Sequence, residues 1–159
     1  MRTQNSNVVI HVTATTDAEQ INQNKVAAQS IEIPNATYEK GGNCLIKSIS
    51  LVDETNIGME CDIIFSSLST AITQDEGKSV GEDVDDLDGT IAKMTGFVSI
   101  AAANYTDLVD ARLATKTGID LMVESAPDST SIYMHIINRG SAVTFSETND
   151  IKVNVGILQ

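Results

Sequence analysis

Residues 114–124 read Ala-Thr-Lys-Thr-Gly-Ile-Asp-Leu-Met-Val-Glu, with polar and apolar side chains in alternation. A period of two residues is typical of a β-strand that has one face on a core and the other in water. Residues 151–157 repeat the pattern, with Ile, Val, Val and Ile separated by Lys, Asn and Gly. The residues of the first stretch expected to share one face are Thr115, Thr117, Ile119, Leu121 and Val123.

Further strand candidates bring the expected total to about eight. They are residues 8–13, 30–38, 44–53, 59–65, 97–101 and 131–138. Residues 131–138 are apolar on both faces, which predicts a strand covered on both sides. Pro34 cannot donate a ladder hydrogen bond, so its strand is expected to lie at an edge or to carry a bulge.

Residues 44–53 and 59–65 are separated by a turn-like segment and predict a β-hairpin. In that hairpin Cys44 and Cys61 lie about six positions out of register. A disulfide needs Cα atoms within about 7 Å, so the spacing excludes one in a regular hairpin. We expect two buried free thiols in a reducing compartment.

Helical signals are few. Residues 85–95 begin with acidic residues, carry Lys93 near the end and space three apolar residues for one face, which predicts one short helix. Residues 14–28 fit either a weak helical stripe or a loop that crosses between sheets.

These patterns predict an all-β, single-domain β-sandwich of jelly-roll type. Residues 1–24 are expected to form a polar N-terminal arm with the first strand, and residues 25–159 the sandwich domain. A chain of 159 residues buries roughly two-thirds or more of its unfolded surface, which is enough for a core without disulfides.

The charge balance argues against nucleic-acid binding. Ten basic residues face 22 acidic ones, for a net charge of -12, and the basic residues do not cluster. No apolar run is long enough to span a membrane, and the N-terminus does not have the pattern of a signal peptide. Residues 75–88 contain seven acids and one lysine, which predicts a solvated loop or, alternatively, a loose calcium site.

The sequence indicates a protein without catalytic residues, metal or cofactor. His11 and His135 both fall in strand candidates, and neither accompanies a nucleophile, zinc or nucleotide motif. Aromatic residues are few, with 3 Phe, 3 Tyr and no Trp, which lowers the expectation of sugar or base stacking.

Four segments follow one another in a familiar order: Lys-Val-Ala-Ala-Gln-Ser-Ile-Glu-Ile-Pro-Asn-Ala at 25–36, Gly-Gly-Asn-Cys-Leu-Ile-Lys-Ser-Ile-Ser-Leu-Val-Asp at 41–53, Gly-Phe-Val-Ser-Ile-Ala-Ala-Ala-Asn-Tyr at 96–105 and Ser-Ile-Tyr-Met-His-Ile-Ile-Asn-Arg-Gly at 131–140. With the final alternating strand, they resemble a group of small virion proteins of tailed bacteriophages. The likeness extends over residues 25–159. The chain departs from the group at residues 109–111, where Val-Asp-Ala replaces an expected glycine-containing turn.

The resemblance implies a head decoration (cement) protein that binds the outside of the capsid and clamps neighbouring subunits. The implied partners are the major capsid protein and further copies of the chain, as a dimer or trimer. The implied location is the capsid surface of a virion, after synthesis in the host cytoplasm. The candidate contact residues for the capsid or for self-association are Val8, Ile10, Val12, Asn104, Tyr105 and Arg139.

Two alternatives remain. A tail or receptor-binding jelly roll would recognise a host-surface ligand such as a glycan, using Tyr38, Tyr105 or Tyr133 as platforms. A metal-dependent enzyme of the cupin type would use the same fold, but it would need more histidine ligands than the two in this chain.

Overall fold

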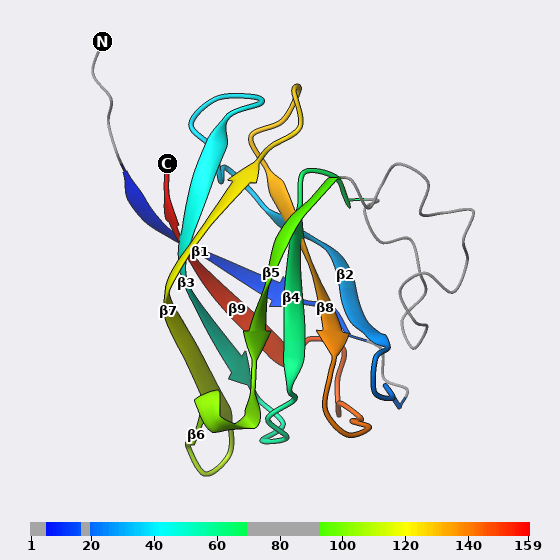
Figure 1. Ribbon diagram of the computed structural model, residues 1–159. Helices are drawn as coiled ribbons and strands as arrows, with labels where there is room; N and C mark the ends of the chain where they lie inside the picture. Colours follow the sequence, from blue (N-terminus) through cyan, green and yellow to red (C-terminus); the bar gives the residue numbers. More distant parts are fainter. Residues whose placement is uncertain (1–5, 17–19, 70–92) are drawn as a thin grey trace, which may run out of the picture.

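The computed structural model describes residues 6–16, 20–69 and 93–159, and it shows two antiparallel β-sheets packed face to face (Figure 1). The five-stranded sheet has the order β1-β9-β3-β7-β6 and the four-stranded sheet the order β2-β8-β4-β5. The elements are β1 (Asn7–Ala14), β2 (Val26–Ile33), β3 (Asn43–Asp53), β4 (Cys61–Ser66), β5 (Met94–Ile100), the 3₁₀ turn η4 (Ala102–Asn104), β6 (Tyr105–Asp107), β7 (Arg112–Glu124), β8 (Ile132–Asn138) and β9 (Ile151–Leu158).

The strand order is that of a jelly roll, as predicted. Apart from the short strand β6, one sheet holds β1-β9-β3-β7 and the other holds β2-β8-β4-β5. Only β4 and β5 follow each other within a sheet, and every other connection between these strands crosses from one sheet to the other. Eight strands wound in this way between two antiparallel sheets form the jelly-roll sandwich.

The core lies between the sheets and is mainly aliphatic. Strand β9 contributes alternate residues to it, as its sequence pattern predicts. Strand β3 contributes Cys44 and Ile46 and then, after a register shift that changes the phase, Ile49 and Leu51. Phe65 and Phe145 are the fully buried aromatic members of the cluster. Each buried isoleucine, leucine or phenylalanine contributes about 1.5–3 kcal/mol relative to an exposed one, so many aliphatic side chains replace the few missing aromatic anchors.

Strand β7 differs from its predicted face assignment. Ile119, Leu121 and Val123 do point inward, but Thr115 and Thr117 lie on the exposed face. The phase changes at residues 118–120, where Gly118 and Asp120 have positive φ angles and the register with β3 shifts. A bulge of this kind reverses the inward and outward faces along one strand, so a single alternation cannot describe it.

The predicted hairpin of residues 44–53 and 59–65 is wrong. Strand β3 lies in the five-stranded sheet between β9 and β7, and β4 lies in the four-stranded sheet between β8 and β5. The turn-like segment between them is therefore a crossover between sheets. Cys44 and Cys61 are nevertheless buried and free, as predicted.

Strands β1 and β2 lie in different sheets, and the described residues between them, 15–16 and 20–25, contain no helix. The pairing of Ile21 with Val143 fixes this connection to the one between β8 and β9. Residues 7–14 are an edge strand of the five-stranded sheet, paired with β9, and thus part of the sandwich. The helix expected at residues 85–95 and the acidic segment 75–88 fall mostly or wholly outside the described residues, and Met94 already belongs to β5.

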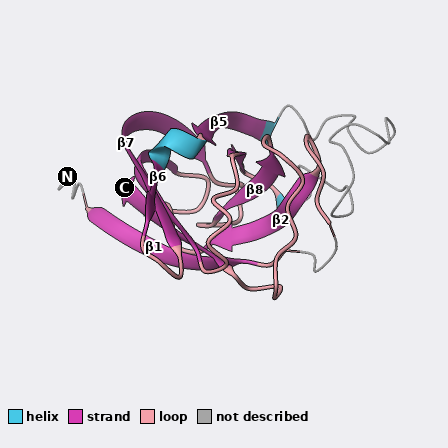
Figure 2. Cartoon of the chain, turned by 90° about the horizontal axis from the view of Figure 1, so that it is seen from below, coloured by secondary structure: helices cyan, strands magenta, loops and turns pink. Residues whose placement is uncertain are grey.

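The expected edge position and bulge are confirmed, since β2 is the edge of its sheet and its register with β8 shifts twice. The predicted bounds 30–38 are wrong, because the strand spans Val26–Ile33 and ends directly before Pro34. Seen from below, β1 and β2 lie on one side of the sandwich and β5 and β7 on the other (Figure 2). Strand β8 is central and almost entirely buried, in line with its two apolar faces.

Candidate contact surface

The most unusual exposed feature is the connection between β6 and β7, residues 108–111, which we call the β6–β7 tip. It presents two large apolar side chains to solvent, with Leu108 51% and Val109 81% exposed. Val109 also has a φ angle of 80°. A β-branched residue rarely adopts this left-handed conformation, because its side chain clashes with the backbone.

Hydrogen bonds hold the strained tip in place from both sides. Within the hairpin, the Asp107 side chain accepts a bond from the N–H of Val109 at 2.8 Å. From the β3–β4 connection, the side-chain amide of Asn56 donates to the Val109 carbonyl at 2.9 Å. The tip is therefore a fixed structure, positioned by a loop that is distant in sequence.

The β3–β4 loop is in turn fixed by one buried carboxylate. Asp53 is fully buried and accepts bonds from the Thr55 N–H at 2.9 Å and the Gly58 N–H at 2.6 Å. Arg112 donates through Nε to Asn56 and through Nη1 to the Ile57 carbonyl, both at 3.1 Å. These contacts link the core to the tip in a continuous chain of hydrogen bonds.

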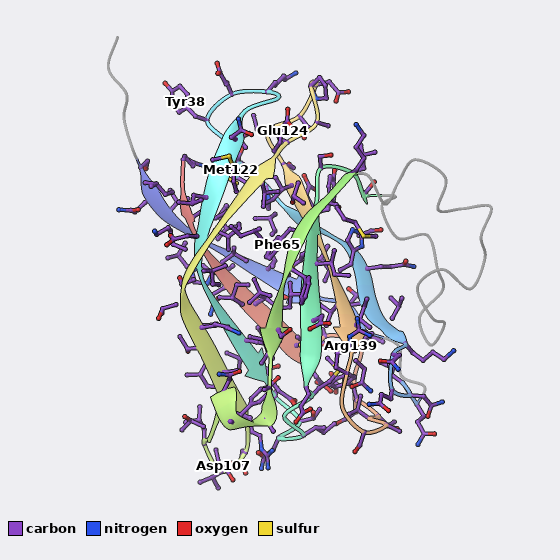
Figure 3. All side chains as sticks on the ribbon, viewed as in Figure 1. Tyr38, Phe65, Asp107, Met122, Glu124 and Arg139 are labelled. Carbon is purple, nitrogen blue, oxygen red and sulfur yellow. The ribbon has the colours of Figure 1, made fainter. Side chains whose placement is uncertain are left out.

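A cleft with a volume of about 500 Å³ lies at the same end of the sandwich. Its walls come from the β3–β4 loop, from η4 and from the start of the β8–β9 connection, and they include Arg112, Arg139 and Glu60. The N–H groups of Arg139 and Gly140 both donate to the Glu60 carbonyl, at 2.8 and 3.3 Å. Figure 3 shows Asp107 and Arg139 at this end, and Tyr38 and Glu124 at the opposite one.

Of the predicted contact residues in the loops, Arg139 lines this cleft, Asn104 and Tyr105 lie in or next to η4, and each has a partner within the chain. The Tyr105 hydroxyl donates to the Met59 carbonyl at 2.7 Å, and the Asn104 side chain accepts from the N–H of Ala101 at 2.8 Å. Arg139 forms an ion pair with Asp62, with Nε and Oδ2 2.6 Å apart. Of these three, only Arg139 is exposed, so it is the one whose surface lies open to a partner.

The remaining predicted contacts are Val8, Ile10 and Val12 on β1. Their side chains pack against the core of their own sandwich. Their strand pairs with β9 of the same chain. What they offer to another molecule is therefore the outer backbone edge of β1 rather than their side chains.

The sequence patterns did not identify Leu108, Asn56 or Arg112 as contact residues. Residues 109–111 were notable only as a departure from the group of virion proteins. Polarity gives no signal here, because an exposed leucine and valine look like core residues in a sequence. The one available signal was the missing glycine in a tight turn, since a non-glycine residue there must adopt a strained backbone.

Burial shifts the pKa of His135 and of the two cysteines toward their neutral forms. His135 is fully buried; its Nδ1 accepts the Ser30 N–H at 3.1 Å, and its Nε2 lies 3.0 Å from the Ser66 hydroxyl. Burial lowers the pKa of His135 to about 4. Burial also raises the pKa of Cys44 to about 11 and that of Cys61 to about 12. These groups are suited to a structural role in the core.

The histidines do not converge on a common site. His11 is exposed on β1, where its Nδ1 lies 2.5 Å from Oδ1 of Asn154, whereas His135 is buried in the other sheet. In the described ranges, no three His, Cys, Asp or Glu side chains are placed to hold a metal ion together. A search of the same residues for a helix able to cross a membrane finds none.

The tyrosines named for a glycan site differ in access. Tyr38 is 78% exposed in the β2–β3 connection, at the end opposite the tip (Figure 3). Tyr105 is partly buried, and burial raises its pKa well above the usual range. Tyr105 is thus unsuited to stacking on a sugar, and Tyr38 is the more exposed aromatic platform.

Comparison with known proteins does not identify a family. No family model matches the chain, and no curated protein matches it. Among solved structures, the N-terminal CBM22-1–GH10 modules of Clostridium thermocellum endo-1,4-beta-D-xylanase 10B, complexed with xylohexaose, share 15% identity at a TM-score of 0.30. The match covers 95% of this chain and 26% of that chain, so this chain spans about a quarter of the matched structure.

Proposed function

We propose that the chain is a non-enzymatic structural protein that binds the outer surface of a bacteriophage capsid and stabilises the shell. It does so together with further copies of itself, at the capsid surface of the virion. The β6–β7 tip is its main contact with the major capsid protein. The resemblance to small virion proteins supports the partner, and the geometry of the tip supports the surface.

The observation that carries the proposal is the exposure of Leu108 and Val109 on a strained but fixed turn. Backbone strain of about 1–3 kcal/mol persists only where other interactions hold it, and it is concentrated at functional positions. A leucine and a valine presented together suit an apolar depression on a partner, which would bury them. The turn is already ordered, so binding costs little conformational entropy.

The test uses Val109→Asn on the full chain and capsids that lack the protein. Asparagine tolerates the left-handed conformation and removes the exposed apolar side chain, so the fold is retained and the apolar contact is lost. We expect co-sedimentation with capsids to weaken about tenfold or more, because burying a valine side chain contributes about 1.5–3 kcal/mol. Protection of the shell against heat or osmotic shock should weaken in parallel.

The matched control is Tyr38→Asn, which changes an exposed side chain at the opposite end (Figure 3). Capsid binding should be unchanged in this variant. If Tyr38→Asn abolishes binding and Val109→Asn does not, the tip is not the contact surface. If wild-type protein does not bind capsids and instead binds host-surface glycans through Tyr38, the receptor-binding alternative replaces the proposal.

A further inference from the structure

The described sheets end in four edge strands, which are β1, β6, β2 and β5. An edge strand carries unpaired N–H and C=O groups that accept a strand from another molecule. Folded proteins usually protect such edges by shortness, bulges, proline or charged side chains. The four edges differ in this protection.

Three of the edges are protected. Strand β6 has only three residues. Strand β2 has two register shifts and is followed at once by Pro34. The register of β5 with β4 shifts between Phe65 and Ser66, and the Leu121 side chain of β7 packs against Gly96.

Strand β1 has none of these devices. Its eight residues, Asn7–Ala14, pair with β9 at eight successive positions without a register shift. They include no charged residue and no proline. Its other edge pairs with no strand within the described part of the chain. A cavity of about 390 Å³, lined by His11, Thr13 and Glu32 among others, lies between β1 and the end of β2 in the same chain.

We infer that the free edge of β1 pairs antiparallel with β1 of a second copy, about a two-fold axis. In an antiparallel pair, opposite residues point to the same face. Val8, Ile10 and Val12 of one copy therefore continue the inner face of the other, and the two five-stranded sheets become one. The contact is isologous, as a two-fold dimer requires.

Charge favours a second copy at this edge over other surfaces. The chain has a net charge of -12, so two copies repel each other at most approaches. Residues 3–16 contain no charged residue at all, which makes β1 a neutral strip on an acidic protein. This inference rests on the self-association that is part of the proposed function, and it names the surface responsible.

The experiment is analytical ultracentrifugation of the free full chain, without capsids, over about 1–100 µM. The wild type should form a dimer. Val9→Lys places a charge on the exposed edge strand, opposite Gly156 on β9, and should raise the dimer dissociation constant at least tenfold. Thr106→Lys places the same charge on the exposed face of edge strand β6 and should leave the dimer dissociation constant unchanged.

Hydrogen exchange gives a second readout that does not need a variant. Amides of residues 7–14 should become more protected in the wild type as concentration rises, whereas those of β6 should not change. A monomer at every concentration overturns the inference, as does a dimer with no added protection in β1 or one that Thr106→Lys weakens equally. If the free chain stays monomeric but binds capsids and Val109→Asn weakens that binding, the dimer inference fails and the proposed function stands. If the free chain dimerises through β1 but does not bind capsids, the inference stands and the proposed function fails.

Discussion

Ser30 and Val109 are both non-glycine residues with left-handed backbones, with φ angles of 55° and 80°, and they lie in very different surroundings. At Ser30, the irregular backbone of β2 turns an N–H toward Nδ1 of the buried His135. At Val109, the irregular backbone displays a valine side chain that is 81% exposed. One irregularity provides a partner for a buried polar group, and the other leaves an apolar group uncovered.

The difference indicates which interaction compensates the backbone strain at each of the two residues. The hydrogen bond from Ser30 satisfies an imidazole nitrogen that burial would otherwise leave unpaired, which would cost about 1–3 kcal/mol. The Ser30 irregularity therefore stabilises its own fold. Exposing Val109 gives the folded chain no comparable gain, so its benefit has to come from a partner that covers it.

The largest effect should come from acidification, which acts on His135, the buried hydrogen-bond partner of Ser30. The unfolded histidine has a pKa of 6.5, and burial lowers the folded value to about 4. Above pH 6.5 both states are neutral and this stability is fully present; as the pH falls toward about 4, only the unfolded state binds the proton. The free energy of unfolding should fall by roughly 3 kcal/mol over this range from His135 alone.

Urea unfolding at a series of pH values measures this effect. His135→Gln should be less stable at neutral pH but should lose less stability on acidification than the wild type. His11→Gln, which changes an exposed histidine, should retain the full acid dependence. Equal acid dependence in the wild type and His135→Gln would show that the buried imidazole is not the responsible group.

The sequence predicted most of the fold, because alternation reports directly which face of a strand is buried. Strands β8 and β9 and the edge position of β2 agree with it. The prediction failed where two strands adjacent in sequence belong to different sheets, as β3 and β4 do. A crossover loop and a hairpin turn use the same polar and turn-forming residues, so local pattern alone cannot separate them.

The next largest effect concerns the support of the tip. Asp53→Ala removes the acceptor for the N–H groups of Thr55 and Gly58 in a fully buried position. We expect a loss of about 2–3 kcal/mol in the free energy of unfolding, because buried donors are left unpaired. Binding to capsids should weaken as well, since the β3–β4 loop positions the tip. Thermal unfolding and co-sedimentation measure the two effects.

Asp62→Ala is the control for Asp53→Ala, because it removes a carboxylate on the outer face of β4 that accepts from the side chains of Ser99 and Arg139 and not from the β3–β4 loop. It loses the ion pair with Arg139. Partly exposed ion pairs usually contribute about 0–1 kcal/mol, so the loss should be small and the tip should be unaffected. Comparable losses in the two variants would contradict the role assigned to Asp53.

The candidate site was less predictable than the fold. Arg139 and Tyr105 were identified from the resemblance, and the structure does bring their loops to one end. The tip was missed because its support is nonlocal: Asn56 reaches the Val109 carbonyl across 53 positions of sequence. No single-sequence pattern encodes such a contact.

A smaller effect should come from Asn56, which joins the loop to the tip. Asn56→Ala removes the bonds to Val109 and Arg112 and places alanine at a φ angle of 60°. The loss should be about 1–2 kcal/mol in thermal or chemical unfolding. Asn56→Gly keeps the backbone conformation and loses only the bonds, so it should be the milder of the two. A larger loss in the glycine variant would show that backbone strain is not part of the effect.

The smallest effect compares the two left-handed residues directly. Val109→Gly relieves about 1–2 kcal/mol of strain and adds about 0.5–1 kcal/mol of backbone entropy cost, so the fold should gain about 0.5–1 kcal/mol. Ser30→Gly relieves similar strain but loses the bond from the Ser30 hydroxyl to the Ser69 carbonyl, at 2.6 Å, so it should gain nothing. Thermal unfolding measures the change in stability of each variant. If Val109→Gly raises stability and weakens capsid binding, the strain at the tip is retained for contact; if both variants gain equally, the two irregularities do not differ in kind.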